Sequence, residues 1–202
     1  AAARGMIDRV HDGDTVSVVV YNTQSTVLVA PTTIGPGRKP ELQLGLRNIE
    51  ARGHTCISCG VEEGLAQLDR REGAVNRLLL LSDGQANTGV RDEQGFRSLA
   101  ARARDRGVTI SSLGVDVDYD ERLLLAVAQA SNGRHYFVES PAGLPRVFDE
   151  ELRSLKQTVV ANAEAVIDLA PGVELAQVFD RPFTRRGDQL VVPFGTFAAG
   201  DD

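Results

Sequence analysis

Asp83 is a residue whose type and position could support chemistry. It follows an apolar run at residues 78–81, and so short and unbroken a run predicts a strand buried on both faces of a parallel sheet. Gly84 lets the chain turn sharply after Asp83. Because open α/β sheets bind ligands outside the carboxyl ends of their strands, the Asp83 carboxylate is a candidate binding group. A lone Asp-Gly pair more often only shapes a turn, and that alternative stays open.

Cys56 and Cys59 form a second candidate pair, a C-x-x-C spacing at the start of a predicted helix, with His54 nearby. Thiols at a helix N-terminus can have a lowered pKa and exchange disulfides, so the two cysteines are a candidate redox pair. A zinc site would need two more ligands, and the sequence has no second C-x-x-C. The commoner alternative is that both are small side chains that fill the loop and the buried side of the helix.

Other carboxylates favour structural roles. Asp116, Asp118 and Asp120 are spaced like a calcium-binding ladder, but the glycine and the distant glutamate of an EF-hand loop are missing, so helix capping is favoured. The sequence also lacks the nucleophile elbow G-x-S-x-G and the phosphate loop G-x-x-x-x-G-K-[ST], which makes a hydrolase the less favoured function.

Composition narrows the function classes. The chain of 202 residues carries a formal net charge of −6, which argues against a nucleic-acid binder. Its hydrophobic content of 42% is enough to build a buried core. No apolar run approaches the roughly 20 residues that span a bilayer, so we expect no membrane span in this chain.

The order of predicted elements indicates the fold class. Helical and strand patterns alternate through residue 155, with helices expected at 1–10, 41–51, 58–69, 94–106, 120–130 and 144–155, and strands at 15–21, 25–30, 78–81, 108–115 and 134–138. This order predicts an α/β domain at residues 1–157: a doubly wound, mainly parallel sheet with one antiparallel edge hairpin strand. Residues 158–202 change texture, with strands expected at 163–169, 173–179 and 189–194, which predicts the start of a β-sandwich-like segment.

Several of these pieces together resemble a von Willebrand factor A domain. They are the hairpin GDTVSVVVYNTQSTVLVAP, the loop ARGHTCISCGVEEGL, and the segments NRLLLLSDGQANTG, GVTISSLGVD and NGRHYFVES. The resemblance covers about residues 1–155. It looks most like the bacterial branch that is similar to calcium-activated chloride channel proteins and inter-α-trypsin inhibitor heavy chains, in which a β-rich segment follows.

The resemblance implies a metal-ion-dependent adhesion site. In the family, three loops hold Mg²⁺ or Mn²⁺, and Thr55 and Asp83 match the ligands of the second and third loops. The first loop, Asp-x-Ser-x-Ser, does not occur in this sequence. Residues that would form the rim of the site are Ser82, Gly84, Gln85 and His54.

The implied function is a protein–protein interaction or adhesion-type module. A divalent metal, Mg²⁺ or else Mn²⁺ or Ca²⁺, would bridge Thr55 and Asp83 to a carboxylate of a partner protein, with no catalytic residues. Two side chains supply only part of the six-oxygen shell of Mg²⁺, so we expect binding to this chain to be weak or absent. The alternative is a metal-free structural module of a larger bacterial envelope or assembly protein.

The resemblance also implies that the chain is an N-terminally truncated piece, because the family's first strand would precede it. That strand lies in the middle of the family's sheet, between the strands at 15–21 and 78–81. Unpaired buried backbone groups cost roughly 1–3 kcal/mol each. We therefore expect these two strands to pair directly, or residues 189–194 or a second molecule to fill the position between them.

Overall fold

The computed structural model describes residues 2–46, 53–68, 74–179 and 183–198. The chain divides into two compact units, Ala1–Lys156 and Gln157–Asp202. This division lies next to the expected boundary between residues 157 and 158. The expectation that the second unit begins a β-sandwich stays a prediction. Among the described residues, no helix is both long enough and apolar enough to cross a bilayer.

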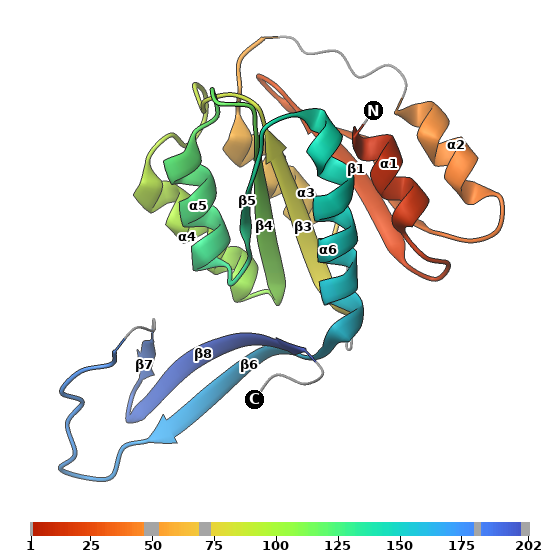
Figure 1. Ribbon diagram of the computed structural model, residues 1–202. Helices are drawn as coiled ribbons and strands as arrows, with labels where there is room; N and C mark the ends of the chain where they lie inside the picture. Colours follow the sequence, from red (N-terminus) through yellow and green to blue (C-terminus); the bar gives the residue numbers. More distant parts are fainter. Residues whose placement is uncertain (1, 47–52, 69–73, 180–182, 199–202) are drawn as a thin grey trace. The chain divides into compact units, whose positions relative to one another are not determined.

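The first unit is built on a parallel sheet of three strands (Figure 1). β3 Asn76–Ser82 pairs with β4 Val108–Val115, and β4 pairs with β5 His135–Val138. The apolar run at residues 78–81 lies within β3, so the predicted strand is confirmed. The first seven residues of β4 are buried, as expected for a strand covered on both faces. The carboxyl ends of these strands share one edge of the sheet, and Asp83 follows β3 at that edge.

Helices cover both faces of this sheet (Figure 1). One face is covered by α3 Ile57–Ala66, α4 Glu93–Arg104 and α5 Glu121–Ala130. α6 Leu144–Gln157 covers the other face. The side chains of β3 alternate between them: Leu80 belongs to the first core, and Leu79 and Leu81 pack against the second. The predicted α/β class with helices on both faces is therefore confirmed for this sheet.

Helix starts differ in how they are capped. The expected capping role of Asp120 is confirmed, because its carboxylate accepts a hydrogen bond of 3.2 Å from the Leu123 N–H at the start of α5. α3 begins instead after Cys56, and the Cys56 side chain makes no capping hydrogen bond. α3 therefore begins one residue before the helix expected at 58–69. The short helix expected at 41–51 begins earlier, as α2 Arg38–Gly45, and residues 47–52 lie outside the described chain.

The hairpin β1 Thr15–Tyr21 and β2 Ser25–Thr33 forms a separate two-stranded antiparallel sheet. Together with α1 Ala2–Arg9 and α2 it encloses a small apolar cluster centred on Ile7, Val29 and Leu46. The hairpin is therefore not an edge of the parallel sheet, and this detail of the predicted fold is wrong.

The expected direct pairing of the strands at 15–21 and 78–81 is also wrong. Over their described lengths, β1 has backbone partners only in β2, and β3 only in β4. Residues 189–194 do not fill the position either, because they pair within the second unit. The ladder between β1 and β2 carries two register shifts, and at each of them β2 has one residue more than β1. Such bulges increase the twist of a strand and interrupt its ladder.

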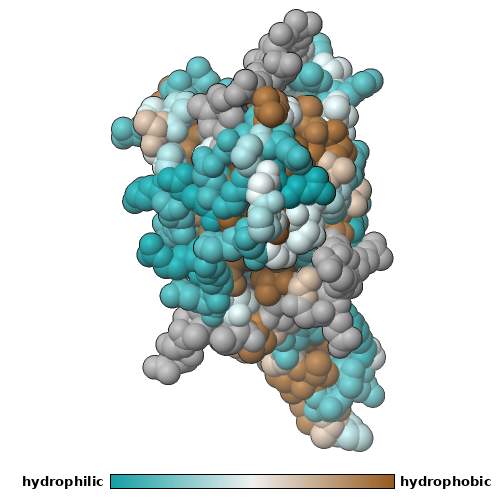
Figure 2. Space-filling model, turned by 90° about the vertical axis from the view of Figure 1, so that its right-hand side faces the viewer, coloured by the Kyte–Doolittle hydropathy of each residue, from teal (hydrophilic) through white to brown (hydrophobic). Residues whose placement is uncertain are grey.

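The second unit is a three-stranded antiparallel sheet in the order β6-β8-β7. Its strands are β6 Thr158–Asp168, β7 Thr184–Arg186 and β8 Gln189–Ala198. The strand expected at 173–179 is not formed, so its alternating pattern predicted the wrong state. Several apolar side chains of this unit are exposed, Val166 and Ile167 among them. Figure 2 shows a brown, apolar area in its lower part.

A buried charged network ties α6 to the parallel sheet. Glu151 of α6 is 0% exposed and accepts a hydrogen bond of 2.6 Å from the Arg77 guanidinium at the start of β3. Its carboxylate also accepts from the Ser111 hydroxyl at 3.0 Å and from the Tyr136 hydroxyl at 2.8 Å. One carboxylate thus contacts all three strands, and its acceptors are well occupied, as a buried charge requires.

Replacing Glu151 with alanine should lower the free energy of unfolding by about 3–5 kcal/mol, because the Arg77 charge would stay buried without its partner. Glu150→Ala is a matched control one residue earlier. Glu150 is a partly exposed carboxylate that pairs with Arg134 at 3.3 Å, and its loss should cost less than about 1 kcal/mol. Urea unfolding of both variants measures the difference. Equal losses would show that the buried network contributes no more than a surface pair.

Candidate functional site

Thr55 lies in the loop that leads into α3, and hydrogen bonds to two asparagines hold the backbone of this loop. The Thr55 N–H donates to the Asn87 Oδ1 at 2.7 Å, and the Asn87 N–H donates back to the Thr55 carbonyl at 3.1 Å. The next amide, that of Cys56, donates to the Asn22 carbonyl at 2.8 Å. The His54 N–H donates to the Thr23 hydroxyl at 3.1 Å. These bonds therefore fix the loop before α3 to the turn after β1 and to residues 85–92, which we call the rim loop.

Asp83 lies in the turn after β3, and its side chain is exposed. Ser82 is buried and its hydroxyl donates to the Gly84 carbonyl at 3.0 Å, which closes the turn. A Cβ atom placed on Gly84 would lie 3.8 Å from the Thr55 Oγ1. The structure thus brings the Thr55 hydroxyl beside the turn that carries Asp83. Gln85 and His54 are exposed next to these residues in the chain.

Tyr21 connects the hairpin to the parallel sheet at this site. It is the last residue of β1, and its hydroxyl donates a hydrogen bond to the Leu81 carbonyl near the end of β3. The ring packs on α3 at Gly60, where an added Cβ would meet it at 2.4 Å. Burial raises the pKa of Tyr21 to about 12, the Ser82 hydroxyl acts in the opposite direction, and the Asp83 charge raises it further. The phenol therefore stays protonated and donating at neutral pH.

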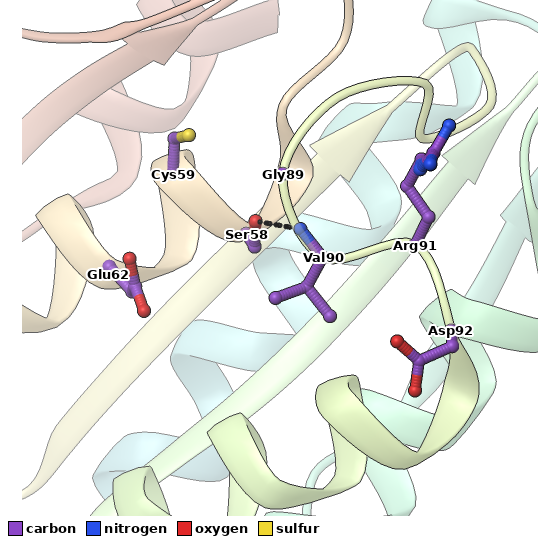
Figure 3. A pocket seen from close by; sticks show the side chains of 7 residues that line it. All are labelled: Ser58, Cys59, Glu62, Gly89, Val90, Arg91 and Asp92. Carbon is purple, nitrogen blue, oxygen red and sulfur yellow. Dashed lines mark hydrogen bonds between the residues drawn. The ribbon is translucent and has the colours of Figure 1, made fainter.

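Cys56 and Cys59 are joined by a disulfide, with their Cα atoms 5.3 Å apart. Cys56 is fully buried, whereas Cys59 is partly exposed. Cys59 lines an open hollow of about 840 Å³ between α3 and the rim loop (Figure 3). Its other lining residues are Ser58, Glu62, Gly89, Val90, Arg91 and Asp92. The two cysteines of the candidate redox pair are therefore covalently bonded to each other.

The donor chemistry around Thr55 fits a hard divalent cation only in part. A hydroxyl and a carboxylate are oxygen ligands of the kind that Mg²⁺ prefers, but they are two of about six. Within the described ranges, no group of three or more His, Cys, Asp or Glu side chains is arranged to hold a metal. In the calcium-like spacing of Asp116, Asp118 and Asp120, two carboxylates bond to backbone amides. Asp120 caps α5, and the Asp116 carboxylate accepts from the Val117 N–H at 2.8 Å.

Sequence reasoning missed the residues that assemble this site. Asn87 and Asn22 follow the ends of β3 and β1, where asparagine commonly bonds to backbone in turns. That signal marks a turn but does not say which distant loop its amide will contact. Tyr21 closes an apolar strand, and only its phenol oxygen, which needs a partner when buried, pointed to a further contact.

Comparison with known proteins identifies the family. The family model for the von Willebrand factor type A domain matches residues 1–150, well over half of the chain. The chain belongs to the von Willebrand factor type A domain family. Domains of this family are usually non-catalytic.

Relatives of this von Willebrand factor type A domain include bacterial proteins. The uncharacterized protein YfbK of Escherichia coli K12 is 27% identical over 169 residues, which is 82% of this chain and 29% of YfbK. A von Willebrand factor type A structure from Catenulispora acidiphila superposes with a TM-score of 0.80 at 19% identity, covering 98% of this chain and 49% of that one. This chain thus spans half or less of the length of both proteins.

A third similar structure is proximal thread matrix protein 1 of the mussel byssus, in which zinc occupies the MIDAS (metal-ion-dependent adhesion site) motif. It matches with a TM-score of 0.60 and 19% identity over 74% of this chain and 37% of that one. This likeness, like that to the Catenulispora structure, shows the shared fold.

Replacing Tyr21 with phenylalanine removes the donor to the Leu81 carbonyl and should lower the free energy of unfolding by about 1–3 kcal/mol at pH 8. The folded-state pKa of Tyr21 lies above the ordinary value of 10.0, at about 12. Its stabilisation is therefore fully present below pH 10 and is lost as the pH rises towards 12.

Urea unfolding at several pH values checks this prediction. The difference in stability between the unmodified chain and Tyr21→Phe should shrink between about pH 10 and pH 12, since only the unmodified chain has this phenol to ionise. A difference that stays constant across that range would mean that the Tyr21 hydroxyl is not the interaction being lost.

Proposed function

We propose that this chain is a protein-binding module that contacts an acidic group of a partner protein through a divalent metal ion. Thr55 and Asp83 would hold the metal, and Ser82, Gly84, Gln85 and His54 would form the rim around it. The metal would supply a positive charge with an open position for a carboxylate of the partner. No general base or nucleophile is required for such a contact.

The observation that carries this proposal is the position of Thr55. Its hydroxyl lies 3.8 Å from where a Cβ on Gly84 would stand, directly beside the Asp83 turn. The two residues come from loops 28 positions apart in the chain, and the reciprocal bonds between Thr55 and Asn87 hold those loops together. Asp83 is exposed, so its carboxylate is accessible to both a hydrated ion and a partner.

Family membership supports the same reading. The byssus protein of this fold has a zinc-occupied MIDAS motif, so the fold can carry a metal at such a motif. We further propose that the chain is closest in kind to the bacterial branch that resembles calcium-activated chloride channel proteins and inter-α-trypsin inhibitor heavy chains. The C-terminal antiparallel sheet after the α/β unit supports this assignment.

Ligand number limits the affinity that this chain can reach. Two oxygen side chains leave most of the coordination shell of Mg²⁺ or Mn²⁺ to water, and a hydrated ion gains little from so few protein ligands. We therefore expect millimolar or weaker binding by the 202-residue chain. The same donor count favours the second candidate function, a metal-free scaffold module, in which Asp83 and Thr55 only shape the loop edge.

Paramagnetic broadening by Mn²⁺ tests the site even when binding is weak. Titrating an isotope-labelled chain with Mn²⁺ should broaden the amide signals of residues 53–56 and 82–85 before all others. Asp83→Asn removes the charged ligand and should abolish this selective broadening while leaving the other signals in place.

Asp118→Asn serves as the matched control, since Asp118 is an exposed aspartate in the loop after β4. The control variant should broaden like the unmodified chain. Selective broadening around residues 116–120, or broadening near Thr55 that persists in Asp83→Asn, would contradict the proposed ligands. No selective broadening at all would favour the metal-free scaffold.

A further inference from the structure

The two sulfurs of the Cys56–Cys59 disulfide differ in accessibility. Cys56 is 0% exposed and is enclosed by the rim loop, whereas Cys59 is partly exposed and faces the open hollow on α3 (Figure 3). An external thiol entering this hollow can contact Cys59, whereas Cys56 has no exposed surface and does not line the hollow. Because disulfide exchange requires direct attack on one sulfur, the structure selects which sulfur is attacked.

The buried Cys56 sulfur has a hydrogen-bond donor, the Ser58 hydroxyl, beside it. The Ser58 Oγ lies 3.6 Å from the Cys56 Sγ, and Ser58 is 3% exposed. This hydroxyl accepts a hydrogen bond of 3.0 Å from the Val90 N–H, drawn in Figure 3. Its lone pair is thus engaged by Val90, which leaves its own proton free to be donated to a Cys56 thiolate. Cys56 is also the N-cap of α3, and a helix N-terminus favours a thiolate.

Gly89 allows the rim loop to lie directly against this group. Its backbone has a positive φ of 73°, and an added Cβ would stand 2.5 Å from the Ser58 Oγ and 2.6 Å from the Cys56 Sγ. The loop therefore packs most closely on Cys56 and Ser58, whereas the same Cβ position lies 3.8 Å from the Cys59 Sγ, and Cys59 lines the hollow. This arrangement combines an accessible sulfur for attack with a stabilised sulfur for departure.

We propose that Cys56–Cys59 is an exchangeable disulfide that is opened by low-molecular-weight thiols. A thiolate attacks the Cys59 sulfur, a new sulfur–sulfur bond forms there, and the bond between the cysteines breaks. Cys56 departs as a thiolate that accepts the hydrogen bond from Ser58. A second thiol molecule then attacks the mixed disulfide and releases Cys59. In total, two thiols become one external disulfide, and two electrons and two protons pass to the cysteine pair.

This exchange site is separate from the proposed metal contact. Both hydrogen bonds of the Thr55 backbone run to Asn87, and neither involves a sulfur atom. Failure of either proposal would therefore leave the other intact. Mn²⁺ broadening reports on one site, and thiol chemistry reports on the other.

Two single-cysteine variants of the 202-residue chain test the direction of attack. In Cys56→Ser the remaining Cys59 thiol should react with oxidised glutathione at least tenfold faster than the Cys56 thiol does in Cys59→Ser. Mass spectrometry measures both rates of glutathione addition under native conditions, with circular dichroism confirming that both variants are folded. Faster reaction at Cys56 would overturn the proposal, because the buried sulfur would then be the accessible one.

Ser58→Ala tests the departure of Cys56. Reduction of the intact disulfide by glutathione should slow by about tenfold, the effect of losing one hydrogen bond to a charged group. A loosened loop alone would speed reduction rather than slow it, so faster reduction in Ser58→Ala would contradict the proposed role of the Ser58 hydroxyl.

Ser98→Ala is the matched control on α4, where the exposed Ser98 hydroxyl donates to the Gln94 carbonyl at 2.9 Å. It should leave the reduction rate unchanged. Reduction of the unmodified chain only as fast as it unfolds globally would also overturn the proposal, since the hollow would then give no access to the folded disulfide.

Discussion

The hydrogen bond from the Tyr21 hydroxyl to the Leu81 carbonyl is the link on which the candidate site depends. β1 and β3 share no backbone ladder over their described lengths, so this side chain joins the ends of the two strands. The ring fits only because Gly60 presents no side chain to it. Tyr21 thereby positions Asn22, whose carbonyl holds the Cys56 amide, and the turn that carries Asp83.

Side-chain-to-backbone contacts assemble the loop edge around this link. Thr55 and Asn87 exchange two hydrogen bonds, and Ser58 connects α3 to the rim loop through the Val90 amide. Such contacts satisfy loop backbone groups that no strand or helix reaches. They also place two proposed sites close together along the chain: the metal contact proposed at Thr55 and Asp83, and the disulfide of Cys59, which lines a hollow.

The parallel sheet could be predicted from the sequence because its signals are local. Residues 78–81 are apolar without a break, and a strand buried on both faces is the state that such a run favours. The Asp83 turn and the Asp120 cap could likewise be predicted from neighbouring residues. The pairing of β1 could not be predicted, because it depends on the register shifts of the hairpin and on which distant carbonyl the Tyr21 phenol reaches. Residues 173–179 alternate like a strand, yet alternation alone does not provide a backbone partner.

The Thr55–Asn87 contact could be predicted only in part, since each residue lies in a recognisable turn but the contact between the two turns depends on the fold.

Amide hydrogen exchange in Tyr21→Phe tests most directly whether Tyr21 organises this edge of the sheet. The account predicts that exchange at Thr55, Cys56 and Asn87 accelerates about tenfold, equal to roughly 1.4 kcal/mol of local stability, while the amides of β4 keep their protection. Equal acceleration throughout the α/β unit, or none at these three amides, would contradict it.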